Sequence, residues 1–125
     1  MTNLDIIKGF LAEWGSGGMV PAIEALFSDD AVWRNSGFPP CQGKEACVAL
    51  AAQYVPTLPA VEVELLAAAE NGDTVFTQRI DRCKNPDGVI TVEAEVCGVF
   101  TLRDGKVVSW YDYFDPAEFP ADSGG

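Results

Sequence analysis

Three ionisable residues in the second half of the chain could carry out acid–base chemistry together. Arg79 and Asp81 are two residues apart, and Asp112 has the aromatic residues Trp110 and Phe114 at the same spacing. If both segments are strands, the residues of each set share one face of a sheet. An unpaired carboxylate on such an apolar face is costly, so we expect a partner that neutralises it or a raised proton affinity that serves a chemical task.

The segments around these residues have the composition of β-strands. Residues 107–115 are rich in β-branched and aromatic side chains, and residues 89–102 alternate between apolar and polar ones. With residues 74–83 they predict an antiparallel meander with one buried face. On the last strand, Val108 and Asp112 are expected on that buried face.

The two hairpins determine which side chains lie opposite each other. A three-residue loop in the second hairpin would place Val96 opposite Asp112, and a four-residue turn in the first would place Ala94 opposite Arg79. Arg79, Asp81 and Asp112 then point to the same side, with roughly 11 Å between the backbones of Arg79 and Asp112. The small side chain of Ala94 would leave room for the guanidinium. Such an Arg–Asp pair is most often structural, but the second acid and the aromatic surroundings favour a functional site.

Composition limits the class of protein. The 125 residues suffice for one domain, 1–125, and 48% of them are hydrophobic, which indicates a globular chain. The net charge of −11, from 8 basic and 19 acidic residues, argues against nucleic acid or an anionic membrane surface as a partner. A neutral or apolar small molecule is the more compatible ligand.

The N-terminus and the cysteines favour a cytoplasmic protein. The charged residues Asp5 and Lys8 interrupt the apolar stretch that a signal peptide would need near the start of the chain. No apolar run is long enough to span a membrane. None of the four cysteines has metal-type spacing; Cys83 is expected inside and Cys97 outside, as free thiols.

Histidine is absent from the chain. This excludes nucleophilic catalysis by Ser–His or Cys–His pairs and argues against a zinc or non-haem iron site. We therefore expect a reaction without metal or cofactor that runs on Asp, Glu, Tyr, Lys or Arg side chains.

The order of elements predicts an α+β fold. Helices are expected at 3–14, 22–27 and 44–54, with short strands at 31–35 and 61–65 before the meander. A curved antiparallel or mixed sheet wrapped on about three N-terminal helices would enclose a conical apolar pocket, with the three charged groups inside it.

Four stretches together resemble one known family. They are Asp-Ala-Val-Trp-Arg-Asn at 30–35, Phe-Pro-Pro at 38–40, Arg-Ile-Asp at 79–81 and Trp-Tyr-Asp-Tyr-Phe-Asp at 110–115. In this order they resemble the limonene-1,2-epoxide hydrolases, which belong to the ketosteroid-isomerase-like, nuclear-transport-factor-2-like cone superfamily. The resemblance spans nearly the whole chain.

The resemblance implies a one-step hydrolysis of a small hydrophobic epoxide, cyclic or terpenoid-like, to a vicinal diol. It implies that Asp112 takes a proton from water, that Asp81 gives one to the epoxide oxygen, and that Arg79 holds both. It also implies that Asn35 orients the water and that the protein is a homodimer. Where the family has a tyrosine that helps to hold the water, this chain has Trp33, whose N–H can donate but not accept.

Trp33 is accordingly either a donor to the water or only a wall of the pocket. The residues expected to contact substrate are Trp33, Cys83, Ala94, Val96, Trp110 and Phe114. The chain ends soon after Phe119, which predicts a shortened C-terminal cover with a wider mouth, and residues 123–125 are expected to be frayed.

Two other functions stay open. A protein of the same fold could be an isomerase or polyketide cyclase, although the Asp–His pair common among such cyclases cannot form here. The pocket could also bind an apolar ligand without catalysis. An outward set of Val99, Tyr111 and Tyr113, with Cys97 beside it, suggests that the outer sheet face meets another subunit.

Overall fold

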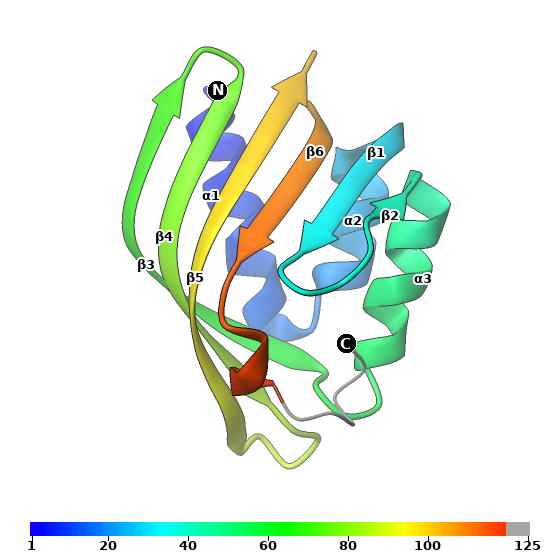
Figure 1. Ribbon diagram of the computed structural model, residues 1–125, viewed down its shortest axis with the longest axis vertical. Helices are drawn as coiled ribbons and strands as arrows, with labels where there is room; N and C mark the ends of the chain where they lie inside the picture. The colour runs from blue at the N-terminus through cyan, green and yellow to red at the C-terminus, as the bar shows by residue number, and fades with distance from the viewer. Residues whose placement is uncertain (120–125) are drawn as a thin grey trace.

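The computed structural model describes residues 1–119 of the chain (Figure 1). The elements in order are α1 (Asn3–Glu13), the 3₁₀ turn η1 (Trp14–Ser16), α2 (Met19–Leu26), β1 (Phe27–Asn35), β2 (Cys41–Gln42), α3 (Lys44–Tyr54), β3 (Ala60–Asn71), β4 (Thr74–Lys84), β5 (Ile90–Arg103), β6 (Lys106–Tyr113) and the 3₁₀ turn η2 (Pro116–Glu118). The expected frayed residues 123–125 lie outside the described part.

Within this part the strands form one six-stranded sheet in the order β2-β1-β6-β5-β4-β3. Strands β1 and β6 are parallel and all other neighbours are antiparallel, so the sheet is mixed. Figure 1 shows that β3, β4 and β5 bend strongly and that the three α-helices cover one face of the sheet. The predicted α+β class, with a curved sheet on three helices, is confirmed.

Local sequence signals explain where the first helix begins and ends. Thr2 caps α1 through a capping box, in which its hydroxyl accepts from the N–H of Asp5 and the Asp5 carboxylate accepts from the N–H of Thr2. After η1, Gly17 adopts the left-handed conformation with φ of 83°, which glycine reaches without steric cost. The chain thereby turns towards α2. No helix among residues 1–119 is long and apolar enough to cross a bilayer.

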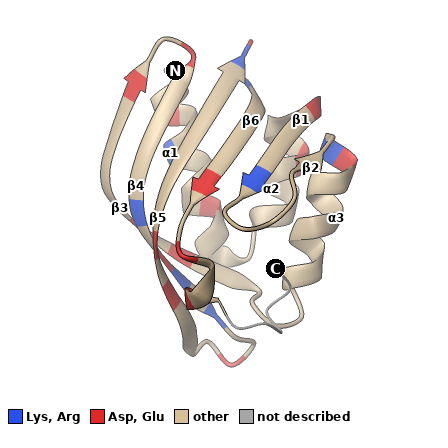
Figure 2. Ribbon diagram, in the orientation of Figure 1, with Lys and Arg blue, Asp and Glu red and all other residues tan. Residues whose placement is uncertain are grey.

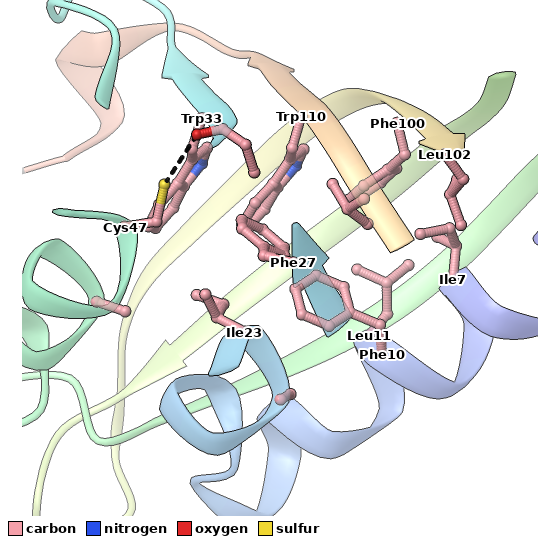
Figure 3. Packing of buried hydrophobic residues seen from close by; sticks show 14 of the residues in the cluster. Ile7, Phe10, Leu11, Ile23, Phe27, Trp33, Cys47, Phe100, Leu102 and Trp110 are labelled. Atoms are coloured by element: carbon pink, nitrogen blue, oxygen red, sulfur yellow. Dashed lines mark hydrogen bonds between the residues drawn. The ribbon is translucent and has the colours of Figure 1, made fainter. Parts of the chain in front are cut away.

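The core between the helices and the sheet is built around aromatic rings (Figure 3). Trp110 stacks on Trp33 with ring centroids 4.4 Å apart and on Phe100 with centroids 5.4 Å apart. Phe10 and Phe27 meet Trp110 edge-on, at 5.6 and 6.0 Å. This cluster fixes the orientation of the Trp110 indole.

The hairpin between β5 and β6 differs from the prediction. Arg103 pairs with Lys106, so the loop has two residues, Asp104 and Gly105, with φ of 52° and 78°. Positive φ at both positions is the two-residue turn that suits the twist of a hairpin. An extra residue in β6 then shifts the register, so Val107 is buried and Val108, expected on the buried face, is only half-buried.

The expected pairings of both hairpins were wrong by two residues, an even number. Asp112 lies opposite Gly98 instead of Val96, and Arg79 lies opposite Val96 instead of Ala94. Because side chains alternate with period two, an even shift leaves Arg79 and Asp112 on their predicted face. The prediction that Arg79 and Asp112 point to the same side therefore holds.

Several strand limits also differ. The predicted strand ended at residue 65, but β3 continues to Asn71. The prediction stopped early because a bulge between Leu65 and Ala67 interrupts the period-two pattern, and the residues that follow are mostly alanine. β1 begins at Phe27 instead of Ala31, and the short β2 lies where no element was predicted. Figure 2 shows acidic positions spread over helices, strands and turns.

Candidate functional site

One guanidinium joins two carboxylates at the middle of the curved sheet. Arg79 donates from Nε to Oδ1 of Asp81 at 2.8 Å and from Nη2 to Oδ2 of Asp81 at 3.2 Å. The same Nη2 donates to Oδ2 of Asp112 at 2.6 Å. The predicted convergence of Arg79, Asp81 and Asp112 is therefore present.

This trio is removed from water. Arg79 is 1% exposed, and Asp81 and Asp112 are each 7% exposed. With both acids ionised the trio would carry one net negative charge in a medium of low dielectric constant. One proton shared between the two carboxyls makes the trio neutral, and such coupled acids titrate as a pair.

Asp112 has a second donor that the sequence did not predict. Trp110, two residues earlier on β6, donates from Nε1 to Oδ1 of Asp112 at 2.7 Å. Each oxygen of Asp112 thus accepts one hydrogen bond from the protein, and each keeps a further lone pair for another donor. The alternation of apolar residues placed Trp110 on this face, but it did not show which way the indole nitrogen points.

Arg79 is held by further contacts from its own strand and from η1. Its Nη1 donates to the hydroxyl of Thr77 at 3.2 Å, and that hydroxyl donates to the carbonyl of Gly98 at 3.1 Å. The guanidinium carbon lies 5.3 Å from the centroid of the Trp14 ring, within cation–π distance. Residue types and spacing do not indicate these roles for Thr77, Gly98 and Trp14, because all three residue types are common in any core.

The environment shifts the proton affinities of the trio. Burial raises the pKa of Asp112 above the usual value for a carboxyl, although the charge and hydrogen bond of Arg79 act in the opposite direction. Burial alone would lower the pKa of Arg79, but the charges of Asp112 and Asp81 outweigh it and raise that pKa. Arg79 therefore stays protonated, and Asp112 is a stronger base than an exposed aspartate.

A largely apolar cavity of about 110 Å³ lies against this trio. A single water needs about 10–15 Å³ on such a measure, so the cavity has room for a small organic molecule. Eight predicted site residues line it: Trp33, Asn35, Asp81, Cys83, Val96, Trp110, Asp112 and Phe114. Ala94 is buried but does not line the cavity, because the strands pair two residues away from the predicted register. Arg79 does not line the cavity either, because the two acids cover it.

Two polar groups beside this cavity, one on β1 and one on η1, have no hydrogen-bond partner among residues 1–119. Trp33 and Trp14 both line it, and neither indole Nε1 has a hydrogen-bond partner in the structure, although both are buried. Asn35, next to Asp112 in the parallel pairing of β1 and β6, also lines the cavity. Both indole N–H groups are therefore unused donors on residues that line the cavity.

The thiols near the cavity are poor nucleophiles. Burial, and then the charge of Asp81, raises the pKa of Cys83 to about 12, so it lines the cavity as a neutral thiol. All four cysteines are free, with Cys83 buried and Cys97 exposed as expected. Within residues 1–119, no group of three or more Cys, Asp or Glu side chains is arranged to hold a metal ion.

Comparison with known proteins identifies the family of the chain. A family model described as the limonene-1,2-epoxide hydrolase catalytic domain matches residues 1–120. The chain belongs to the limonene-1,2-epoxide hydrolase family. Among curated relatives of this family member, epoxide hydrolase EphG of Mycobacterium tuberculosis is 32% identical over 93 residues. That match takes in 74% of this chain and 60% of the length of EphG.

Solved structures share the fold of this family member. An LEH-like epoxide hydrolase of M. tuberculosis is 27% identical and has a TM-score of 0.77, over 93% of this chain and 84% of the other. A protein of ketosteroid isomerase-like fold from Catenulispora acidiphila has a TM-score of 0.80 at 20% identity, over 98% and 95% of the two chains. The latter likeness shows the fold alone.

Proposed function

We propose that the protein is an epoxide hydrolase that adds water to a small hydrophobic epoxide in one step and releases a vicinal diol. The observation that carries the proposal is the single buried guanidinium that joins Asp81 and Asp112 beside an apolar cavity. Membership of the family and the likeness to EphG point to the same activity. No cofactor or metal is required.

In this proposal the two acids have opposite roles. Asp112 accepts a proton from the water whose oxygen attacks one epoxide carbon. As that carbon–oxygen bond breaks, Asp81 gives its proton to the leaving epoxide oxygen, which would otherwise leave as a poor alkoxide. One proton has then moved from Asp81 to Asp112, and its return to Asp81 restores the starting state.

The surroundings support this division of labour. The raised pKa of Asp112 means that this carboxyl, once ionised, is a stronger base than an exposed aspartate, and the permanently charged Arg79 allows one acid to be ionised while the other is protonated. That the proton rests on Asp81 before the reaction is part of the proposal. Asn35 is proposed to hold the attacking water through its side-chain oxygen. Trp33, whose buried N–H lacks a partner in the described part of the chain, is proposed to donate to an oxygen lone pair of the same water.

The walls of the cavity suggest the substrate class. Trp33, Cys83, Val96, Trp110 and Phe114 offer mostly apolar surface. A neutral cyclic or terpenoid-like epoxide would bury its hydrocarbon part there and leave its oxygen near the acids. A charged epoxide would lose its hydration without a counter-charge, because Arg79 is already paired with both carboxylates.

The direct test is a single-turnover reaction in ¹⁸O-labelled water. We expect a panel of cyclic and linear epoxides, assayed by chiral chromatography, to yield diols that carry the label after the first turnover. Asp112→Asn should lower kcat by about 10²–10⁴-fold while the fold is kept. The matched control is Asp104→Asn, because asparagine also tolerates the positive φ of that turn.

Other outcomes would replace the proposal. Label that enters the diol only from a pre-labelled aspartate would indicate a covalent intermediate. Turnover of an enone or polyketide without any epoxide activity would indicate an isomerase or cyclase of the same fold. Tight ligand binding without product, unchanged in Asp112→Asn and Asp81→Asn, would indicate a non-catalytic binding protein.

A further inference from the structure

The guanidinium of Arg79 reaches Asp112 by crossing the strand that lies between them. Thr77 on β4, Gly98 on β5 and Asp112 on β6 lie in one row across the sheet. Arg79 is two residues along β4 from Thr77, on the same face, and its side chain passes over this row to reach Asp112. The point that it passes over is Gly98.

A side chain at Gly98 would occupy the place of the polar groups themselves. A Cβ built there would overlap Nη1 of Arg79 and lie 2.8 Å from both Oδ1 of Asp112 and Oγ1 of Thr77. Because real Cβ atoms essentially never approach another heavy atom so closely, at least one of these groups would have to move. The guanidinium is the group with the closest contact.

Backbone conformation is not the reason for glycine at this position. The glycines with positive φ are at turns and caps, and Gly98, in the middle of β5, is not among them. Glycine within a strand also costs stability, since it has no side chain to pack and loses much conformational freedom on folding. What this position requires is empty space over the strand.

We infer that Gly98 is a positioning residue, whose missing side chain allows the Arg79 guanidinium to lie across β5 and hold Asp81 and Asp112 at once. Thr77 helps to hold the guanidinium in this position, since its hydroxyl accepts from Nη1 of Arg79 and donates to the carbonyl of Gly98. The consequence for catalysis rests on the proposed function, but the geometric role of Gly98 does not.

A single added methyl group should therefore act on the charges and leave the apolar cavity alone. In Gly98→Ala the guanidinium must shift away from β5, so that it loses its contact with Asp112 while it can keep the contact with Asp81 on its own strand. Misplacement of a catalytic group by about 1 Å can cost about 100-fold in rate. We expect kcat to fall by about that factor and KM to change little.

Two measurements test this role. The first compares Gly98→Ala with Gly9→Ala, which adds the same methyl group in α1 where nothing lies within 4 Å. Only Gly98→Ala should lose kcat. In a cycle with Arg79→Lys, which removes the Nη atoms, Gly98→Ala should cost little more, because both changes break the same contact.

The second measurement does not depend on activity. The charged groups that face Asp112 are Arg79 and Asp81, both on β4, and the neutral Trp110 N–H is its other donor. When Arg79 moves away, the pKa of Asp112 should rise further, and ¹³C NMR titration of the aspartate carboxyl carbons would show it. An unchanged pKa of Asp112 together with unchanged kcat would overturn the inference.

A second variant covers the case in which Gly98→Ala fails to fold. Thr77→Val keeps the shape of the side chain and removes the hydroxyl that anchors Nη1, so we expect a smaller rise in the pKa of Asp112 and a smaller loss of kcat. If neither the pKa of Asp112 nor kcat changes in Thr77→Val, the result would contradict the proposed positioning of the guanidinium by Thr77 and Gly98. If the wild-type protein opens no epoxide, the proposed function fails, and the NMR titration still decides the role of Gly98.

Discussion

The indole N–H of Trp110 donates to Oδ1 of Asp112 at 2.7 Å, along the strand that both residues share. Residues two apart on a strand lie on one face, but an indole reaches a carboxylate only if its ring is turned along the strand. Trp33 and Phe100 stack on the two sides of the Trp110 ring and hold that orientation. The aromatic core thus sets the position of an oxygen atom of the proposed base.

The first prediction follows from this hydrogen bond. Trp110→Phe keeps an aromatic ring in the stack and removes the donor, which at present lowers the pKa of Asp112. We expect the acid limb of the pH–rate profile to move to higher pH, and kcat at neutral pH to fall by about tenfold or more. A profile with the acid limb unmoved would show that the hydrogen bond does not tune the base.

The second prediction concerns the buried cation. Arg79→Met leaves two buried carboxyls without a counter-ion, and loss of one partner from such a group costs about 3–5 kcal/mol in unfolding free energy. The cost should shrink at acid pH, because protonated carboxyls need no counter-ion. The measurement is urea denaturation at pH 7 and near pH 4.

A control for this change is available on the neighbouring surface. Arg82→Met removes an arginine of the same strand that pairs with Glu64 and Glu93 on the solvent side. Exposed pairs contribute little, so this variant should stay close to wild type. Equal losses for Arg79→Met and Arg82→Met would contradict the importance of burial.

The third prediction is the pH dependence that follows from Asp112. Its pKa in the folded protein lies above the usual value of about 3.9, so folding favours the protonated form. This contribution to stability is complete below about pH 3.9 and is lost as the pH rises through the folded-state pKa. The stability of wild type relative to Asp112→Asn should therefore fall with rising pH across that window.

Activity should change in the opposite direction over the same range. Asp112 must be ionised to accept a proton, so kcat/KM should rise as the pH increases through its raised pKa. A rate profile that is flat down to the pKa of an ordinary aspartate would contradict the raised value. Stability and activity measured on the same samples give two independent estimates of one pKa.

Sequence patterns predicted the faces of the strands better than their pairing. Alternation alone placed Arg79, Asp81 and Asp112 on one side, because a side chain's face depends only on whether its position is odd or even. The pairing depended on the loops, and the turn at Asp104–Gly105 is one residue shorter than expected. Gly98 was consequently missed as the residue under the guanidinium, and Ala94 was named in its place.

The polar contacts of core residues could not be predicted in the same way. Whether the indole of Trp110 donates to Asp112 depends on a ring orientation that the surrounding rings determine. The same holds for Trp14, which lies in η1, far from the site in sequence, and contacts Arg79 through its ring face. Such contacts follow from packing in three dimensions, which residue types and spacing do not contain.

The fourth prediction concerns the outer face of the sheet, for which we propose a homodimer. Phe76, Val99 and Tyr111 lie in one row across β4, β5 and β6, and Tyr113 is 54% exposed beside them. Contiguous apolar surface of this kind usually marks a protein interface. Gel filtration with light scattering should therefore give twice the chain mass.

A charge placed in this row should separate the subunits. Phe76→Glu would bury an unpaired carboxylate in the proposed interface and should give monomers. Val89→Glu changes another exposed apolar residue, in the β4–β5 turn region, and should leave the assembly unchanged. A monomeric wild-type protein at micromolar concentration would contradict the proposal.

The fifth prediction concerns Trp33, whose buried N–H has no partner among residues 1–119. Trp33 and Trp110 pair in register on parallel strands with ring planes 3° apart, and Figure 3 shows their nitrogens on the same side of the stack. Since the Trp110 nitrogen reaches Asp112 two residues on, the Trp33 nitrogen should be directed towards Asn35, the neighbour of Asp112 across the strands. A water between Asn35 and Asp112 would satisfy it.

Trp33→Phe should therefore separate stability from activity. The smaller ring costs some packing, but no hydrogen bond to a protein group among residues 1–119 is lost, so we expect only a small fall in the melting temperature. The attacking water would lose one of its contacts, and kcat should fall by about tenfold or more. If kcat is unchanged while KM rises, Trp33 is only a wall of the cavity, and Asn35 with Asp112 must hold the water without it.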